Sequence, residues 1–436
     1  MNNMKSFFLG SAFAVVAATG AQAADPILYD VKAPREPVYR CDTTGFFEIP
    51  GTDVCLKIGG FAAAVAYGGV DWEGGGTVPF AVRYFGYTYG NTAEGFNIYA
   101  RGRINFDART ATEYGTVRAF MEFEANTAGS GNTGNALNTR HAYVQFGNWT
   151  FGKTNSVFTD GSVGPDGTDP FTILGTNTTR INQIRYTQAF GNGMSVSVSL
   201  EDSQWAGGSS YYRAYDPDGF RVPAGVAVVD NDWPVVVAGL KYAGDWGSAH
   251  LAGAIGRNEI EGFYEPLGLD FEEDEIGWAI TASLSVNVPS VGEDTSVNLK
   301  GIYTDGLSRY AGPNALGRAT SYGVGWCDAG LDSICLDSDI QVWSVLGFLH
   351  HSFSDRVAGE IGASYQNTQA DRYFFIDDEA RNLDVDAWEV FANVSWTPVS
   401  RTTFIADVHY GNISQDFFNP DNDQALAFGV EVIRSF

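Results

Sequence analysis

The chain has 436 residues, a formal net charge of -26 at pH 7, and only four Cys and five His. This negative charge argues against a nucleic-acid-binding protein, which needs a basic surface. The 52 Gly, 30 Phe, 21 Tyr and 10 Trp residues indicate a β-rich protein with many turns. Outside the N-terminal segment no apolar run reaches the about 18 residues of a transmembrane helix, so a helical membrane protein is excluded.

The first residues combine the three parts of a secretory signal peptide. Lys5 supplies a basic charge, FFLGSAFAVVAATG is an apolar run from Phe7 to Gly20, and AQA at 21–23 offers small residues for cleavage. A short buried helix, the alternative, does not need these parts in this order. We therefore predict a signal peptide over residues 1–23 and export of the mature chain from the cytoplasm.

Residues 24–53 are predicted to form a periplasmic segment ahead of the first strand. In an exported protein the four cysteines are expected to be bridged, because disulfides persist in oxidising compartments. Pairing of sequence neighbours, Cys41 with Cys55 and Cys327 with Cys335, is the simplest connectivity. No pair has the spacing of a redox or zinc motif, so no metal site and no cofactor is expected.

The segment GFNIYARGRINFDAR, residues 95–109, alternates as a β-strand requires, because successive side chains of a strand point to opposite faces. The apolar face carries Phe96, Ile98, Ala100, Gly102, Ile104, Phe106 and Ala108, and the polar face carries Asn97, Tyr99, Arg101, Arg103, Asn105, Asp107 and Arg109. Taken alone, this pattern also fits a soluble sheet with one dry and one wet face.

The same alternation returns along the chain, at 115–125, 141–147, 193–201 and 276–288. In the segment 385–398, the apolar face begins and ends with an indole, at Trp388 and Trp396. Trp favours the two lipid–water interfaces, so this pair is typical of the aromatic girdles of a membrane barrel, although two core anchors of a soluble protein give the same spacing. The last strand-like segment, 427–436, closes on an aromatic residue, Phe436.

Short and long connections alternate between these segments. The short links lie at 108–113, 147–149, 190–193, 243–247, 287–294, 352–355 and 397–400, and the long ones near 68–94, 127–137, 155–179, 203–232, 258–274, 306–337, 368–383 and 413–423. A bacterial outer-membrane barrel has this layout, with short periplasmic turns and long external loops. We predict an all-β protein: a transmembrane antiparallel β-barrel of about 16 strands over residues 54–436.

A closed barrel places the apolar faces against lipid and the polar faces around a lumen, because lipid does not tolerate open sheet edges. About sixteen strands enclose more space than side chains can fill, so the lumen is expected to hold water. The sequence thus predicts a location in the bacterial outer membrane, with lipid and lipopolysaccharide as neighbours.

Several stretches resemble the alphaproteobacterial outer-membrane porin family, of the Brucella and Rhizobium major porin type. They are CLKIGG at 55–60 after GFFEIPGTDV, ARGRINFDARTATEYGTVRAF at 100–120, TFGKTNSVF at 150–158, and the closing Phe436. This resemblance implies a homotrimer and passive diffusion of small hydrophilic solutes and ions. It also implies that the third external loop, about 155–179, folds into the lumen. The PEFGG pattern of enterobacterial porins is absent.

The resemblance also implies a constriction with charges on both sides. The inward loop brings Asp160, Asp166 and Asp169, and the opposite wall offers Arg101, Arg103, Arg118 and Arg185, with Glu122 beside them. Opposed charges across a narrow passage set up a transverse field that favours polar solutes. The alternative is that the arginines only pair with Asp107, Glu122 and Glu124 to hold the wall, and both roles are compatible.

Other functions fit the sequence less well. A lipolytic enzyme is excluded by the absence of a GxSxG motif, and the few residues ahead of the first strand leave no room for the plug of a TonB-dependent transporter. A secreted adhesin would need no conducting lumen. A substrate-selective channel, for example for sugars, is the remaining alternative on the same barrel. The acidic clusters at 270–275, 377–381 and 419–423 are solvated external faces or bind divalent cations beside lipopolysaccharide.

Overall fold

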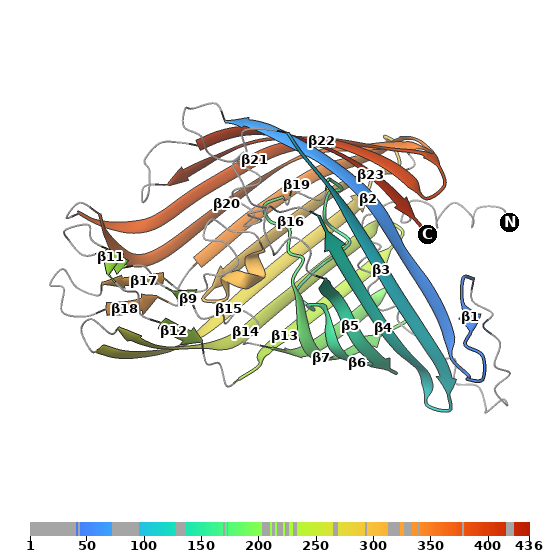
Figure 1. Ribbon diagram of the computed structural model, residues 1–436, viewed down its shortest axis with the longest axis horizontal. Helices are drawn as coiled ribbons and strands as arrows, with labels where there is room; N and C mark the ends of the chain where they lie inside the picture. Colours follow the sequence, from blue (N-terminus) through green and yellow to red (C-terminus); the bar gives the residue numbers. More distant parts are fainter. Residues whose placement is uncertain are drawn as a thin grey trace.

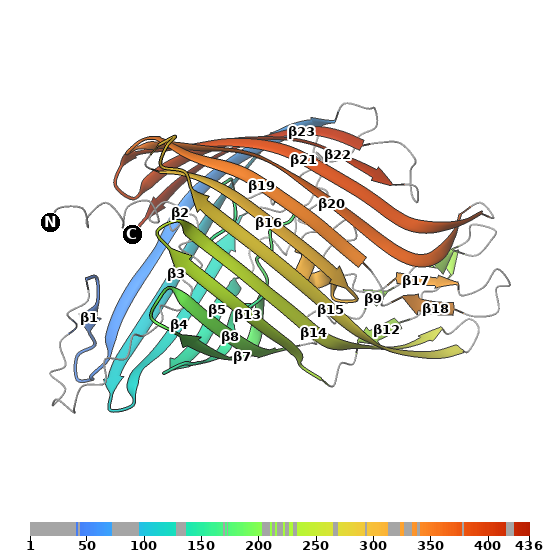
Figure 2. The ribbon, with the colours of Figure 1, turned by 180° about the vertical axis from the view of Figure 1, so that it is seen from behind.

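A computed structural model gives the fold of the chain (Figures 1 and 2). It describes residues 41, 44–71, 96–127, 137–168, 171, 173–202, 210–211, 214–215, 221–222, 226–229, 233–264, 269–292, 294–312, 323–326, 334–337, 341–376, 379–415 and 423–436. Among these residues, no helix is long and apolar enough to cross a membrane.

Sixteen antiparallel strands form a closed barrel, as the alternating sequence predicts. In chain order they are β2 (Cys55–Asp71), β3 (Asn97–Thr112), β4 (Gly115–Asn126), β5 (Asn138–Phe146), β6 (Trp149–Asn155), β7 (Arg180–Ala189), β8 (Met194–Glu201), β13 (Val235–Gly244), β14 (Gly247–Tyr264), β15 (Leu269–Asn287), β16 (Thr295–Asp305), β19 (Gln341–Ser354), β20 (Val357–Ile376), β21 (Glu379–Val399), β22 (Thr402–Gln415) and β23 (Asp423–Ser435). Each pairs with its sequence neighbour in this series, and β2 also pairs with β23, so that Phe61 stands opposite both Arg103 and Ser435. The ring therefore has no free edge, which is the condition for a sheet in lipid.

Smaller strands lie at the two ends of the barrel, and one short helix is buried inside it. They are β1 (Phe47–Glu48), β9 (Ser210–Tyr211), β10 (Ala214–Tyr215), β11 (Arg221–Val222), β12 (Val226–Val229), β17 (Gly323–Trp326), β18 (Ile334–Asp337) and the 3-10 helix η2 (Ser308–Ala311). In Figure 1 the C-terminus and β1 lie at the right-hand end, and β11, β12, β17 and β18 lie at the left-hand end. The two ends of the barrel thus carry different small strands.

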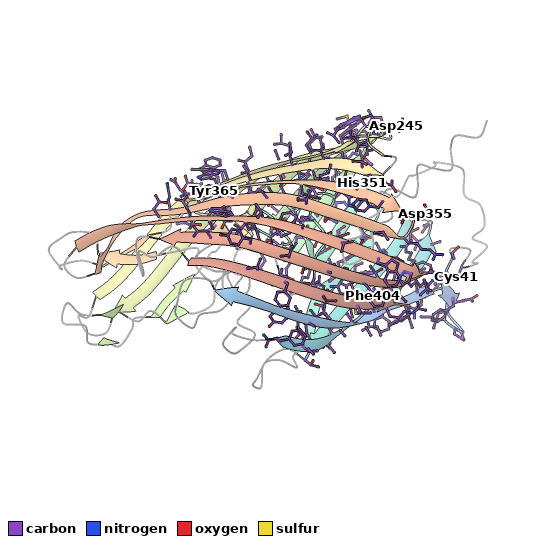
Figure 3. All side chains as sticks on the ribbon, turned by 90° about the horizontal axis from the view of Figure 1, so that it is seen from above. Cys41, Asp245, His351, Asp355, Tyr365 and Phe404 are labelled. Carbon is purple, nitrogen blue, oxygen red and sulfur yellow. A yellow bond between two sulfur atoms is a disulfide. The ribbon has the colours of Figure 1, made fainter. Side chains whose placement is uncertain are left out.

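The short connections gather at the end that carries the C-terminus. Figure 3 shows Asp245 and Asp355, each in a short turn, at the same end as Cys41. The turn before β14 depends on Gly247, whose φ is 136° and where a Cβ would collide with the carbonyl of Ser285. Because the strands are antiparallel, the strand ends joined by the other connections lie at the opposite end of the barrel.

Two of the expected long connections are shorter than the sequence suggests. Strands β14 and β15 continue to Tyr264 and Leu269, and β20 and β21 continue to Ile376 and Glu379. These segments are polar and show no apolar face, and the sequence therefore predicts loops. Beyond the lipid, however, a hairpin can have water on both faces, so its strands can stay paired without an apolar face.

The side chains separate into a lipid-facing and a luminal set. On β21, Trp388 and Trp396 are 37% and 49% exposed on the outer face, whereas Glu389 is 1% exposed and points inward. Large apolar side chains such as Ile98 and Ile276 are also exposed on the outside. An apolar exterior and a polar interior invert the order of a soluble protein and fit a barrel surrounded by lipid.

The N-terminal segment is fastened to the rim of the barrel. Cys41 and Cys55 form a disulfide, β1 pairs with the start of β2, and the Arg109 guanidinium lies 4.9 Å from the centre of the Phe46 ring. The first predicted cysteine pair is therefore present. The second, Cys327 with Cys335, falls outside what the structure describes.

Candidate functional site

The connection between β6 and β7, residues 156–179, enters the lumen instead of extending outward. At its start, Glu201 of β8 accepts hydrogen bonds from Ser156 Oγ (2.9 Å) and from the backbone N–H of Val157 (3.2 Å). The other oxygen of Glu201 accepts a bond of 2.8 Å from the Tyr310 hydroxyl on η2. One buried carboxylate thus joins the base of the loop to two parts of the inner wall.

Three more carboxylates hold the loop on the far side of the ring. The backbone N–H of Asp166 donates to Glu360 of β20 (2.6 Å), that of Thr168 to Asp407 of β22 (2.7 Å), and that of Leu174 to Glu389 of β21 (2.7 Å). In the strand order of the ring, β20–β22 stand opposite β6 and β7, where the loop begins and ends. The loop therefore crosses the lumen.

Apolar contacts add to these bonds. At one end of the loop, Val157 and Phe158 are buried in a cluster with residues of β13, β14, β15, β16, η2 and β19. Further along, Val163 and Ile173 pack with Leu346, Phe348 and Phe391 on the inner wall. Since burying each large apolar side chain stabilises by about 1.5–3 kcal/mol, the loop is a packed part of the barrel.

Asp160 carries the first of the predicted loop carboxylates. It lies 3.1 Å from Lys241 Nζ of β13 and accepts hydrogen bonds from the Ser162 and Ser283 hydroxyls. Burial alone would raise the pKa of Asp160, but the positive charges of Lys241 and His250 hold it below its ordinary value. This carboxylate stays ionised and faces the wall behind the loop.

Asp166 has the opposite environment. Its side chain is half-buried beside Glu360, which also accepts bonds from Asn393 Nδ2 (2.8 Å) and His350 Nδ1 (2.9 Å). Burial and the negative charge of Glu360 raise the pKa of Asp166 above its ordinary value, and His350 only partly offsets them. A neutral Asp166 is thus favoured in the docked loop.

We expect the loop to be held less firmly as the pH rises. The raised pKa of Asp166 means that its neutral form stabilises the docked loop at low pH, and this stabilisation is lost as the pH passes through the raised pKa. Current noise should therefore be larger at about pH 9 than at about pH 6. Asp166→Asn, a neutral isostere, should keep the noise low at both; an unchanged pH dependence in this variant would assign the effect to another group, with His350 the nearest.

Arg101, Arg103 and Arg118, which are predicted to form a basic wall, lie on β3 and β4 and are paired with carboxylates. Glu124 accepts from Arg103 Nε (2.7 Å), Arg101 (3.3 Å) and Arg140 (3.1 Å). Glu122 lies 3.1 Å from Arg140 and 3.6 Å from Arg103, and Glu431 of β23 lies 3.0 Å from Arg101. Positive and negative side chains thus alternate and form ion pairs on this wall. This is the wall-holding role that the sequence offers as an alternative to pore lining.

A second cationic group lies nearer the short turns. Asp107 accepts from Arg118 (2.9 Å) and Arg109 (2.8 Å), so two guanidiniums share one carboxylate. The Arg118 guanidinium lies 5.0 Å from the centre of the Phe120 ring, and Phe120 stacks on Tyr143 at 5.4 Å. Phe120 breaks the polar alternation of its strand because its ring supports this guanidinium.

The remaining predicted residues are separate from these groups. Arg185 of β7 is on the luminal phase of its strand, and its Nε is buried without a hydrogen bond among the described residues. Asp169 lies outside the described residues. The contacts of Asp160 run to β13 and β15 and those of Asp166 to β20, so the loop carboxylates meet the wall behind them instead of the arginines.

Four luminal carboxylates were missed by the sequence analysis: Glu201, Glu360, Glu389 and Asp407. Their alternation with apolar neighbours, as in VSVSLE, marks them as luminal. Nothing local to them names a partner. Among the described residues, no group of His, Cys, Asp and Glu side chains is arranged to hold a metal ion.

The sequence matches the porin subfamily (Porin_2) over residues 25–431. It is 32% identical over 314 residues to Porin Omp2b of Brucella suis, covering 69% of this chain and 74% of the relative. The match to Porin Omp2b of Brucella abortus (strain 2308) is also 32%, over 320 residues, with the same coverage. The family match thus extends from the N-terminal segment almost to the end of the last strand, β23.

Solved outer-membrane proteins share the fold at low sequence identity. The outer membrane channel DcaP of Acinetobacter baumannii superposes with a TM-score of 0.64 at 17% identity, over 88% of this chain and 97% of that one. OmpT of Vibrio cholerae gives 0.51 at 11% identity, over 89% and 100%. The chain therefore belongs to the porin subfamily, of alphaproteobacterial type, and is an outer-membrane channel for passive diffusion and not an enzyme.

Proposed function

We propose that the loop 156–179 and the arginine wall of β3 and β4 form the constriction of this porin. The observation that carries the proposal is the bonding of three loop N–H groups to carboxylates on the opposite side of the ring. A loop held in this way occupies part of the lumen permanently. Small hydrophilic solutes and ions then pass beside it, between loop and wall.

The charges on the wall set the character of this passage. Arg101, Arg103 and Arg118 lie on the luminal face together with Glu122 and Glu124, and Arg185 and Asp160 line the same lumen further round. Fixed charges of both signs in a narrow, low-dielectric space orient water and favour polar over apolar solutes. General diffusion needs no other device, and nothing in the comparisons favours the substrate-selective alternative.

The finer features of the family are part of the same proposal. We infer a homotrimer, removal of residues 1–23, a periplasmic segment from residue 24 to 53, and a second disulfide between Cys327 and Cys335. The export-signal pattern and the match to Brucella porins support these inferences. Intact-mass spectrometry of the purified protein, with and without reductant, measures both whether residues 1–23 have been removed and how many disulfides are present.

Planar-bilayer recording of the purified, folded chain tests the proposed function. We expect large, stable current steps, grouped in threes for a trimer, and a reversal potential in a salt gradient that reports the sign of the dominant luminal charge. Folding is verified first by heat-modifiable migration on a gel. Correctly folded protein that passes no current would contradict an open diffusion pore.

A further inference from the structure

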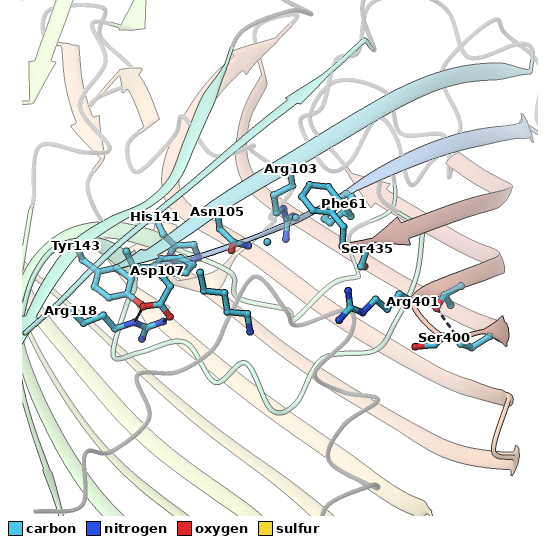
Figure 4. A pocket seen from close by; sticks show the side chains of 17 residues that line it. Phe61, Arg103, Asn105, Asp107, Arg118, His141, Tyr143, Ser400, Arg401 and Ser435 are labelled. Carbon is cyan, nitrogen blue, oxygen red and sulfur yellow. Dashed lines mark hydrogen bonds and ion pairs between the residues drawn. The ribbon is translucent and has the colours of Figure 1, made fainter. Parts of the chain in front are cut away.

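A cavity of about 440 Å³ opens in the lumen near the short turns (Figure 4). Its position follows from the strand register. The loop residue Thr168 bonds to Asp407, Asp407 pairs with Gly429, and Gly429 pairs with Tyr67, whereas the cavity is lined by residues of β2 only as far as Phe61. The cavity therefore lies between the loop and the periplasmic rim, and it shares Arg103 and Arg118 with the arginine wall of the proposed constriction.

The lining of this cavity has an excess of positive charge. Of the charged side chains in the lining, four are cationic, those of Lys57, Arg103, Arg118 and Arg401, and one is a carboxylate, that of Asp107. The oxygens of Asp107 are already bound by Arg118 and by Arg109, which lies outside the lining. Lys57 stands opposite Asp107 in the strand register, yet forms no ion pair among the described residues.

Arg401 is the second cation without an acidic partner among the described residues, and it occupies the short turn between β21 and β22. Its φ of 65° places a non-glycine residue in the left-handed region, which is unfavourable for a side chain of this size. Both Lys57 and Arg401 are exposed, so their charges are available to a solute that enters the cavity.

Aromatic rings complete the lining. Phe61 lies beneath the Arg103 guanidinium at 4.7 Å, and the stacked pair of Phe120 and Tyr143 lies beneath Arg118. These contacts fix the two guanidiniums and leave apolar surface between the charges. A space of this size, with apolar walls and a few convergent charges, has the features of a small-molecule site.

We propose that this cavity is a binding subsite for small organic carboxylates that carry a planar apolar body. Lys57 and Arg401 attract and bind the carboxylate, and the rings of Phe61, Phe120 and Tyr143 contact the body. The inference rests on the proposed diffusion function and adds a preferred solute class to it. The subsite raises the local concentration of such anions on the periplasmic side of the luminal loop.

Benzoate and its uncharged counterpart benzamide test the proposal on the purified, folded channel. We expect benzoate to interrupt the open-channel current in a saturable way and benzamide to have no comparable effect. Acetate, which has the charge without the ring, should bind more weakly than benzoate. Replacing both free cations, Lys57→Gln with Arg401→Gln, should weaken benzoate binding about tenfold, because two charge-assisted contacts are lost.

Arg356→Gln is the matched control, since Arg356 is an exposed arginine in the neighbouring short turn and does not line the cavity. It should bind benzoate like the unmodified protein. Equal effects of benzoate and benzamide, or unchanged binding by the double variant, would overturn the subsite. Calorimetric titration of benzoate into the detergent-solubilised protein measures binding without current, so a non-conducting channel that still binds benzoate contradicts the proposed function alone.

Discussion

Replacing Glu360, Glu389 and Asp407 together by alanine is expected to convert a quiet channel into a noisy one of higher conductance. Each carboxylate accepts a backbone N–H of the luminal loop at 2.6–2.7 Å. A hydrogen bond to a charged group contributes about 1.5–3 kcal/mol, so the three losses remove several kcal/mol from one side of the loop. The base of the loop stays attached through Glu201, and the free part then moves in the lumen.

Single-channel recording measures this effect as the variance of the open current and as the mean step size. A triple variant of Glu113, Asp245 and Asp355 to alanine is the control, because these exposed carboxylates lie in short turns and their loss changes the net charge equally. The control should retain quiet openings. If the current stays quiet in the variant that lacks Glu360, Glu389 and Asp407, the apolar contacts of Val163 and Ile173 suffice to hold the loop.

Replacing Glu124 by glutamine is expected to destabilise the barrel and to shift its selectivity toward anions. Glu124 serves three guanidiniums, those of Arg101, Arg103 and Arg140. Removing one partner from a buried charge cluster costs about 3–5 kcal/mol, because the remaining charges are left without compensation. The wall also gains one net positive charge at the proposed constriction.

Two measurements read these consequences separately. Denaturant unfolding in detergent reports the stability, and the reversal potential in a salt gradient reports the selectivity. Glu113→Gln, in an exposed short turn, removes the same charge away from the arginines and should change neither. A further variant that adds Arg103→Gln to Glu124→Gln should recover part of the stability, since it removes one of the unpaired cations. Additive losses would show that the two residues do not interact.

The sequence determined the architecture of this protein because the information for it is local. A strand in a barrel has lipid on one side and the lumen on the other. The alternation of apolar and polar residues in segments such as 95–109 therefore predicts which side chains face the lipid and which face the lumen. The order of short and long connections then gave the number of strands and their direction. The same alternation identified Arg101, Arg103 and Arg118 as luminal.

The pairing of these arginines with Asp107, Glu122 and Glu124 is one of the two roles that the sequence left open. The partners of the luminal loop were decided only by the tertiary structure. Asp166 and Glu360 are separated by 194 residues along the chain, and Thr168 and Asp407 by 239. The alternation along a strand predicts which face a side chain is on. It does not predict the position of that side chain along the barrel axis relative to a loop from the other side of the ring, because this position depends on the register of every strand between them. For this reason the loop carboxylates, expected to face the arginines, contact other walls, and nothing in the sequence indicates which luminal carboxylates hold the loop.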